Sequence, residues 1–229
     1  MKYILKGAEP PFFKDWKNND KMYQRGRPNW KRLKSKEKQA LHKALLEDQG
    51  GICCYCGRRI VLDDSHVEHF RPQKGYPKLQ LEYENLLSSC QLELQKTEPR
   101  HCGNAKGSWF DEEQTVSPLE PSCESRFEYL EDGSLRAYDN NDEGAKATIT
   151  HLALDIEKLR ELRQAAISAA LEDIDILDEK AIQEQIALYS QHNPVNQQFT
   201  PFCSAIVNVL SSLMTRIDSV SRSHEVQLY

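Results

Sequence analysis

Two cysteines with two residues between them, Cys53 and Cys56, lie in the stretch GICCYCGRR and could bind one metal ion together. This C-x2-C spacing lets a tight turn direct two thiolates at a zinc ion, and Gly57 suits such a turn. The chain has seven cysteines, an odd number. In a reducing compartment a close cysteine pair more often binds metal than forms a disulfide, so the spacing predicts a structural zinc site.

A closed zinc site needs four ligands, so two more are expected downstream. The candidates are Cys90 and Cys102, with His101 as an alternative to the second. Cys54 would point away from a site that its neighbours share. The cysteines without a partner at ligand spacing are predicted to be packing residues: Cys54, Cys123 and Cys203.

The stretch SHVEHFRP, residues 65–72, places a carboxylate, Glu68, beside His66 and His69. A single histidine is more often structural than catalytic, and His66 is predicted to be structural. Glu68 and His69, however, lie between the two pairs of predicted zinc ligands. They offer a base that is neutral at pH 7 and an oxygen ligand for a divalent cation.

Further polar residues follow in the same order along the chain. Asn85 begins the strand-like run NLLSSC, and Asn104 and Lys106 lie in HCGNAKG, where a helix is expected to begin. These side chains add an oxygen ligand and a donor for phosphate. Together the segments offer a neutral base, oxygen ligands for a divalent cation and donors for phosphate within one small motif.

Two other zinc enzymes fit less well. Nucleobase deaminases pair H-x-E with a later P-C-x-x-C, but here the CxxC precedes His66 and Glu68, and no proline stands before Cys53. Zinc proteases need H-E-x-x-H or H-x-x-E-H, and HVEH has neither spacing.

Charge is unevenly distributed along the 229 residues, whose net charge is −5. Residues 1–60 hold 15 Lys and Arg against 6 Asp and Glu, whereas residues 111–229 hold 9 against 22. The basic segment could attract any phosphate backbone, and a solvated helix face is the alternative. The sequence contains no apolar run long enough for a signal peptide or a membrane span, so we expect a cytoplasmic protein without membrane contact.

Local patterns place these residues on short elements. Residues 1–34 suggest an irregular arm packed by its aromatics, and apolar spacing predicts a helix over 35–48 that Gly50 and Gly51 end. Short strands are expected at 58–62, 65–70 and 85–90, and a hairpin around Asp132 and Gly133. Helices are predicted at about 155–177 and after Thr200 and Pro201.

The order CxxC, EHFRP, NLLSSC, CGNAKG resembles an HNH endonuclease with a ββα-metal core stapled by zinc. The flanking stretches KGAEPP, LEDQGGICCYC, FEYLEDGSL and ATITHLALDIEKLRELR resemble the retron-associated and Septu-type antiphage HNH proteins of the PtuB kind. The resemblance covers about residues 1–170.

This resemblance implies a role for each matching residue. His69 corresponds to the general base, Glu68 and Asn104 to the ligands of a catalytic Mg²⁺ or Mn²⁺, and Asn85 to the residue that holds the loop of the base. Neighbouring residues in a regular strand point to opposite faces. Glu68 and His69 can therefore share a site only if the strand twists or ends there. The residues predicted to contact phosphate are Arg71 and Lys106.

We therefore expect an α+β protein with a zinc-stapled ββα-metal core embedded in a mainly helical chain. Its predicted parts are a basic arm and helix at 1–49, the HNH core at 50–112, and a hairpin with an acidic, helical, partner-binding region at 113–229. The resemblance implies cleavage of DNA or RNA with an ABC-type ATPase of the PtuA kind as partner, and a retron reverse transcriptase with its single-stranded DNA nearby. The alternative is a catalytically silent zinc-stapled module that binds protein or nucleic acid.

Overall fold

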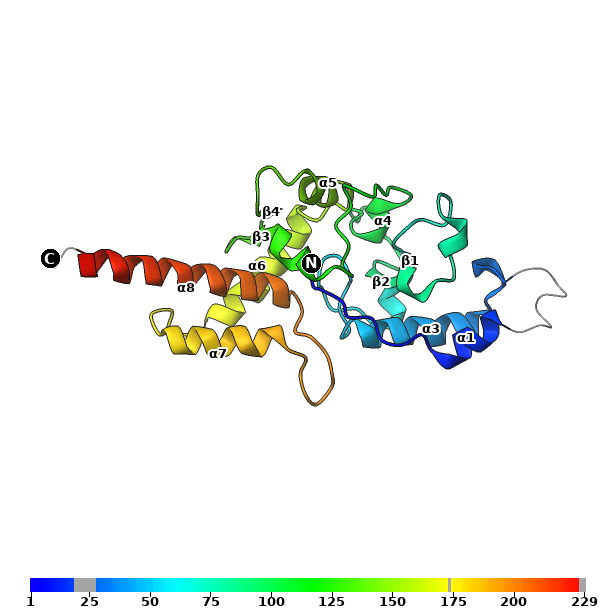
Figure 1. Cartoon of the computed structure of the whole chain (residues 1–229), viewed down its shortest axis with the longest axis horizontal. Helices are drawn as coiled ribbons and strands as arrows, with labels where there is room; N and C mark the ends of the chain where they lie inside the picture. The colour runs from blue at the N-terminus through cyan, green and yellow to red at the C-terminus, as the bar shows by residue number, and fades with distance from the viewer. Residues whose placement is uncertain (19–27, 173, 227–229) are drawn as a thin grey trace.

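In the described part of the chain, helices accompany two small antiparallel sheets (Figure 1). The structure, a computed structural model, describes residues 1–18, 28–172 and 174–226, with side chains as far as residue 217. The mixed α+β class that the sequence predicted is confirmed. Nowhere in these ranges is there a helix with both the length and the apolar character needed to cross a bilayer.

The first sheet carries the central part of the predicted site. Strand β1, Ser65–His69, pairs antiparallel with β2, Leu86–Cys90, so that Glu68 lies opposite Leu87 and Ser65 opposite Cys90. The short helix α4, Gly103–Lys106, follows. The strands expected at 65–70 and 85–90 are confirmed, and the second begins one residue late because Asn85 ends a 3-10 turn.

The prediction of a strand at residues 58–62 is wrong. Only an isolated bridge joins Ile52 to Arg59, and a 3-10 turn follows at Leu62–Asp64. The cause is the tight cysteine turn, in which the Cys53 amide donates to the Arg58 carbonyl oxygen at 2.9 Å. The Arg59 side chain then donates to the carbonyl oxygens of Gly50 and Gly51, so this segment closes a turn and has no strand partner.

The N-terminal part contains more helix than expected. Helix α3, Ser35–Asp48, has the predicted bounds, but α1, Pro11–Lys17, lies within the arm predicted to be irregular. Pro11 occupies the first turn of α1, where its missing N–H costs no hydrogen bond. Phe13 of α1 packs with Leu41 and Leu86 in a buried cluster, so the aromatic packing is confirmed. Residues 19–27 of the predicted arm, including Tyr23, lie outside the described residues.

Among its described residues, the C-terminal part contains the second sheet and four longer helices. Strands β3, Phe127–Tyr129, and β4, Leu135–Ala137, form the predicted hairpin. Then follow α5, Glu143–His151, and α6, Glu157–Leu171, which is shorter than predicted. Helix α7, Glu179–Ser190, packs against α8, Cys203–Val226, whose far end projects from the body (Figure 1).

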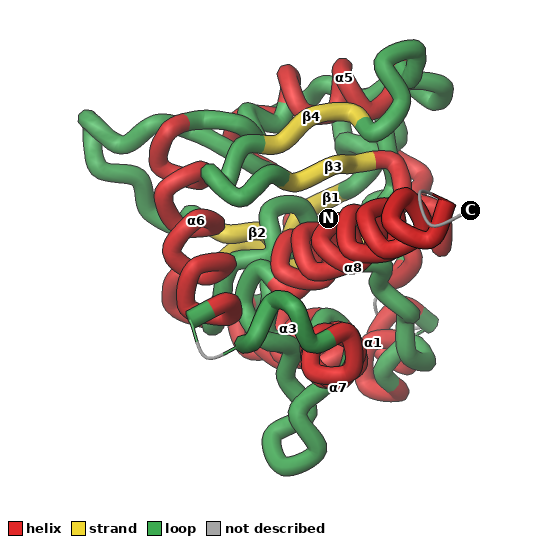
Figure 2. The backbone as a smooth tube through the Cα atoms, turned by 90° about the vertical axis from the view of Figure 1, so that its left-hand side faces the viewer, coloured by secondary structure: helices red, strands yellow, loops and turns green. Residues whose placement is uncertain are grey.

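One hydrophobic cluster runs through all three predicted parts of the chain. It contains Ile4, Tyr55, Leu159 and Leu210, together with the four predicted zinc ligands. In Figure 2 the four strands lie above α8, and α3 and α7 lie below it. Because α8 shares this cluster with the cysteines, the C-terminal part supports the fold of the predicted site.

Candidate functional site

Four buried cysteine side chains meet at the start of α4. The Sγ atoms of Cys53, Cys56, Cys90 and Cys102 all lie within 4.8 Å of one another, and the four thiols are free. The Sγ atoms of Cys56 and Cys90 are 3.9 Å apart. Two thiolates around one tetrahedral zinc ion are about 3.8 Å apart, because each Zn–S bond is about 2.3 Å long. This group could therefore hold zinc.

The chemistry of these thiols also fits a cation. Burial raises the pKa of the Cys102 thiol well above its usual range, so this thiol keeps its proton unless a positive charge lies beside it. Zinc supplies that charge and binds the thiolate. The Nδ1 atom of His101 lies 3.2 Å from the Cys102 Sγ atom, but the compact group consists of four thiols. The geometry favours Cys102 over His101 as the fourth ligand.

Glu68 is a buried carboxylate whose charge is balanced inside the protein. Its Oε1 atom accepts hydrogen bonds from Lys106 Nζ at 2.8 Å and from the Tyr55 hydroxyl at 3.1 Å. Lys106 has a fully buried side chain and also donates to the His69 carbonyl oxygen at 3.2 Å. Burial raises the pKa of Glu68, but His66 and Lys106 outweigh it and lower that pKa below its usual value. The carboxylate is therefore ionised at neutral pH.

The His69 side chain leaves β1 on the face opposite to Glu68, as strand geometry requires. Its Nε2 atom donates to the Gln80 carbonyl oxygen at 3.1 Å, and its ring packs edge-on against Trp30. A carbonyl oxygen only accepts, so Nε2 carries the proton of the neutral ring and Nδ1 is the basic nitrogen. The side-chain amide of Gln73 donates to Nδ1 at 3.3 Å. Burial lowers the pKa of His69, which keeps the imidazole neutral at pH 7.

Asn85 ties together the loop that follows His69. Its Oδ1 atom accepts from the Arg71 amide at 2.8 Å, and its Nδ2 atom donates to the carbonyl oxygens of Arg71 and Leu79, each at 3.1 Å. These bonds join both ends of the segment 71–79. They thereby fix the next residue, Gln80, whose carbonyl oxygen orients His69. Such a position suits the loop-holding role expected of Asn85.

The other predicted site residues are already bonded to protein groups. The Asn104 Nδ2 atom donates to the Gln91 carbonyl oxygen at 2.6 Å. Arg71 forms a bidentate pair with Glu112, with N–O distances of 3.1 and 2.8 Å. A phosphate group would compete with Glu112 for Arg71, and Lys106 is buried against Glu68. The side chains of Glu68, His69 and Asn104 thus bind different protein groups, and their joint role stays a prediction.

Three residues that the sequence did not single out shape this site. Tyr55 links the cysteine turn to Glu68, and Gln80 supplies the carbonyl oxygen that orients His69. Gly103 lets α4 approach β1, because a Cβ atom there would lie 2.7 Å from the Glu68 Oε2 atom. Tyr55 and Gln80 act on residues distant in sequence, so only the glycine of CGNAKG offered a local signal.

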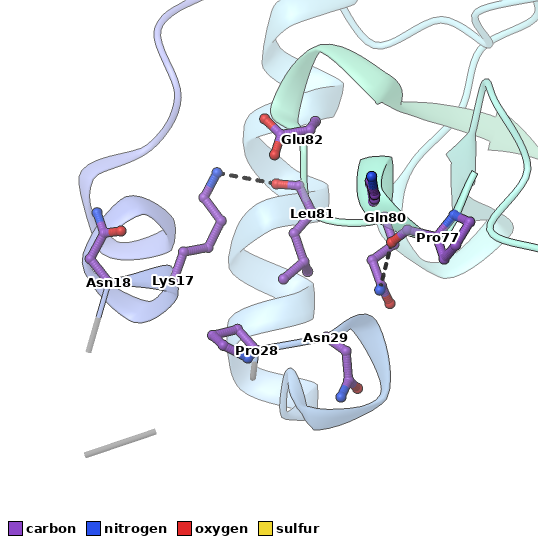
Figure 3. A pocket seen from close by; sticks show the side chains of 9 residues that line it. Lys17, Asn18, Pro28, Asn29, Pro77, Gln80, Leu81 and Glu82 are labelled. Carbon is purple, nitrogen blue, oxygen red and sulfur yellow. Dashed lines mark hydrogen bonds between the residues drawn. The ribbon is translucent and has the colours of Figure 1, made fainter. Parts of the chain in front are cut away.

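A pocket of about 740 Å³ adjoins the residue that orients His69 (Figure 3). It lies between α1 and the 3-10 turns at 30–32 and 77–79, and the Lys17 ammonium inside it donates to the Leu81 carbonyl oxygen at 3.2 Å. Gln80 lines it, whereas its described lining contains none of the predicted site residues. Its lining residues are Lys17, Asn18, Pro28, Asn29, Pro77, Lys78, Gln80, Leu81 and Glu82.

His42, on α3, is a buried histidine next to β1. Its Nε2 atom lies 3.0 Å from the Ser65 hydroxyl oxygen. Burial, and then the nearby His66, lower the pKa of His42 to about 4. An unfolded histidine titrates near pH 6.5. Because the folded state resists protonation, stability that is present above about pH 6.5 is lost as the pH falls towards about 4.

As the pH falls through this window, the free energy of unfolding should decrease less in His42→Gln than in the wild type. The difference between the two decreases should be at most about 3 kcal/mol. Denaturant unfolding at about pH 7 and about pH 4.5 measures the difference. His151→Gln is the matched control, because His151 is exposed. An equal loss of stability in wild type and His42→Gln would show that His42 does not cause the acid sensitivity.

Comparisons with known proteins bear on this arrangement. Over 126 residues, 52% of this chain, the sequence is 33% identical to the "Retron Vc95 putative HNH endonuclease" of Vibrio cholerae and spans 59% of that protein. Over 75 residues, 32% of this chain, it is 32% identical to the Septu protein PtuB of Bacillus thuringiensis and spans 26% of that protein. No family model matches the chain. This chain covers less than two thirds of the length of either relative. The predicted similarity to retron-associated and Septu-type HNH proteins of the PtuB kind is confirmed.

Proposed function

We propose that this chain is a metal-dependent endonuclease of the HNH type, which hydrolyses phosphodiester bonds in DNA or RNA. The observation that carries the proposal is the environment of His69. Its Nε2 atom is held by the Gln80 carbonyl oxygen, and its basic Nδ1 atom faces the exposed side chain of Gln73. The order β1, β2, α4 beside four clustered thiols supports the assignment of a zinc-stapled ββα-metal core.

In the proposed reaction, His69 Nδ1 takes a proton from the attacking water as the water oxygen bonds to phosphorus and the bond to the 3′ oxygen breaks. The water replaces the Gln73 amide at Nδ1. The Gln80 carbonyl oxygen holds the ring in the required tautomer and stabilises the imidazolium as it forms. A general base of this kind contributes about 10²- to 10⁴-fold to the rate.

Glu68 and Asn104 are the proposed protein ligands of a catalytic Mg²⁺ or Mn²⁺. The two hydrogen bonds to Glu68 from Tyr55 and Lys106 both end on Oε1, so Oε2 is the oxygen proposed to bind the cation. When bound there, a divalent cation supplies positive charge for the scissile phosphate and the departing 3′ oxygen. The burial of Lys106 supports a role in keeping Glu68 ionised in place of the expected phosphate contact.

We also propose that the chain acts in antiphage defence with an ATPase partner. The names of the two relatives, one from a retron and one from a Septu system, support this setting. The proposed partner is an ABC-type ATPase of the PtuA kind, with a retron reverse transcriptase and its single-stranded DNA as a further associate. Helix α7 and the projecting end of α8 are the proposed docking region (Figure 1).

A catalytically silent zinc-stapled binding module is the second candidate. Two observations favour it. Lys106 already balances the charge of Glu68, and the Glu68 carboxylate and the His69 imidazole leave β1 on opposite faces. Such a module would bind nucleic acid or a protein partner and would cut neither DNA nor RNA.

Incubation of the purified full chain with plasmid DNA and with total RNA separates the two candidates. Each substrate is tested in Mg²⁺, in Mn²⁺ and in EDTA, with and without the ATPase. The nuclease proposal predicts cleavage that requires a divalent cation and stops in EDTA. If neither substrate is cut even with the partner present, the binding module is the correct function.

A further inference from the structure

His66 lies on the same face of β1 as Glu68, although the sequence suggested only a structural role. The two residues are two positions apart, so strand alternation directs both side chains towards α4. The His66 Nε2 atom is 3.7 Å from the Glu68 Oε2 atom, and the His66 side chain remains 23% exposed. A carboxylate oxygen and an imidazole nitrogen therefore lie side by side on the face of β1 that α4 covers.

Gly103 packs closely against both of these side chains. A Cβ atom on Gly103 would lie 2.7 Å from Glu68 Oε2, 2.9 Å from His66 Nε2 and 3.0 Å from Ser89 Oγ. Three potential ligand atoms thus converge on one side of Gly103. A side chain at position 103 would push them apart, whereas glycine lets them stay close together.

The two carboxylate oxygen atoms of Glu68 have different neighbours. Oε1 accepts from Tyr55 and Lys106, which fix the carboxylate and balance its charge. Oε2 is directed towards His66 and Gly103. Lys106 approaches from the Oε1 side, so Oε2 is the carboxylate oxygen that remains on the side of His66.

The separation of the two ligand atoms suits one ion. Metal–nitrogen and metal–oxygen bonds are about 2.1 Å long, so two ligand atoms of one ion lie at most about 4.2 Å apart. The observed 3.7 Å falls within this limit without any movement of β1. Asn104 instead directs its amide at the Gln91 carbonyl oxygen and would have to turn in order to join them.

We propose that His66 and Glu68 form the principal protein ligands of a divalent cation, and that the imidazole makes this site prefer Mn²⁺ to Mg²⁺. The inference rests on the proposed nuclease function and adds a ligand to it. Imidazole binds transition-metal ions better than it binds Mg²⁺, which prefers oxygen ligands. A site with Glu68 and Asn104 alone would offer only oxygen atoms and would lack this preference.

The test measures Mn²⁺ binding to the zinc-loaded full chain from the EPR signal of free Mn²⁺, independently of cleavage. We expect His66→Ala to raise the Kd for Mn²⁺ about 10-fold or more. Gly103→Ala should weaken binding as well, because its methyl group would displace the Glu68 Oε2 and His66 Nε2 atoms. Asn104→Ala should have a smaller effect than His66→Ala, and Mg²⁺ should displace Mn²⁺ from the wild type only at a large excess.

His192→Ala is the matched control, since His192 is an exposed histidine far from β1 in the sequence. Its Kd for Mn²⁺ should equal that of the wild type, and zinc content and melting temperature should be unchanged in His66→Ala. An unchanged Kd in His66→Ala, or a wild type that binds no Mn²⁺ beside its zinc, overturns the inference. Mn²⁺ binding that depends on His66 without any cleavage of nucleic acid would retain this site and reject the nuclease function.

Discussion

Replacing Cys102 with serine is expected to release the structural zinc and to unfold the core around it. Cys102 is fully buried and belongs to both the four-thiol group and the main hydrophobic cluster. Binding of a structural zinc ion contributes about 10 to 16 kcal/mol to folding in small zinc domains. A domain is stable by only about 5 to 15 kcal/mol in total, so the fold should not survive this loss.

Zinc content by mass spectrometry and the thermal melting curve measure the effect. Cys123→Ser is the matched control, because Cys123 is equally buried but lies outside the four-thiol group. It should keep one zinc ion per chain and lose only about 1 to 3 kcal/mol for the buried hydroxyl. Full zinc content and an unchanged melting temperature in Cys102→Ser would show that His101 is the fourth ligand.

Cleavage by His69→Gln is expected to be slower by about 10²- to 10⁴-fold, while fold and zinc content remain. A glutamine amide can still donate to the Gln80 carbonyl oxygen, but it cannot accept a proton from water. Because burial lowers the pKa of His69, the wild type should keep its activity to a lower pH than an ordinary histidine would allow. Single-turnover rates between about pH 5 and about pH 8 measure both effects.

Two variants separate catalysis from structure at His69. Gln73→Ala removes the amide at Nδ1 and should cut at least as fast as the wild type, because water then reaches the ring more easily. Asn85→Ala should slow cleavage by loosening the segment 71–79, with a smaller effect than His69→Gln. If His69→Gln lowers the melting temperature as much as Cys102→Ser does, His69 is a structural residue.

Local patterns predicted those parts of the site that depend on short-range geometry. The alternation in SHVEH predicts a strand because its residues point to two different surfaces, and Cys53 and Cys56 meet because two intervening residues suit a zinc turn. Cys90 and Cys102 could also be predicted as zinc ligands. Cys90 ends β2, and Cys102 directly precedes α4. The helix at 35–48 had clear apolar spacing and a glycine stop.

Long-range contacts explain what the sequence did not reveal. Lys106 suggested a phosphate contact, but its burial depends on Glu68, which lies 38 residues away. The role of Gly103 depends on how closely α4 packs against β1. Residues 58–62 have strand-like composition, yet the cysteine turn and the Arg59 contacts occupy them. Helix α1 was missed because two adjacent prolines are also typical of irregular chain.

The most direct test of the proposed chemistry is a digest of end-labelled nucleic acid by the full chain with its ATPase partner in Mg²⁺ or Mn²⁺. Attack by a water that His69 deprotonates, with departure of the 3′ oxygen, predicts products with 5′-phosphate and 3′-hydroxyl ends. EDTA should stop the reaction. Products with 2′,3′-cyclic phosphate ends, or cleavage that continues in EDTA, would contradict the account.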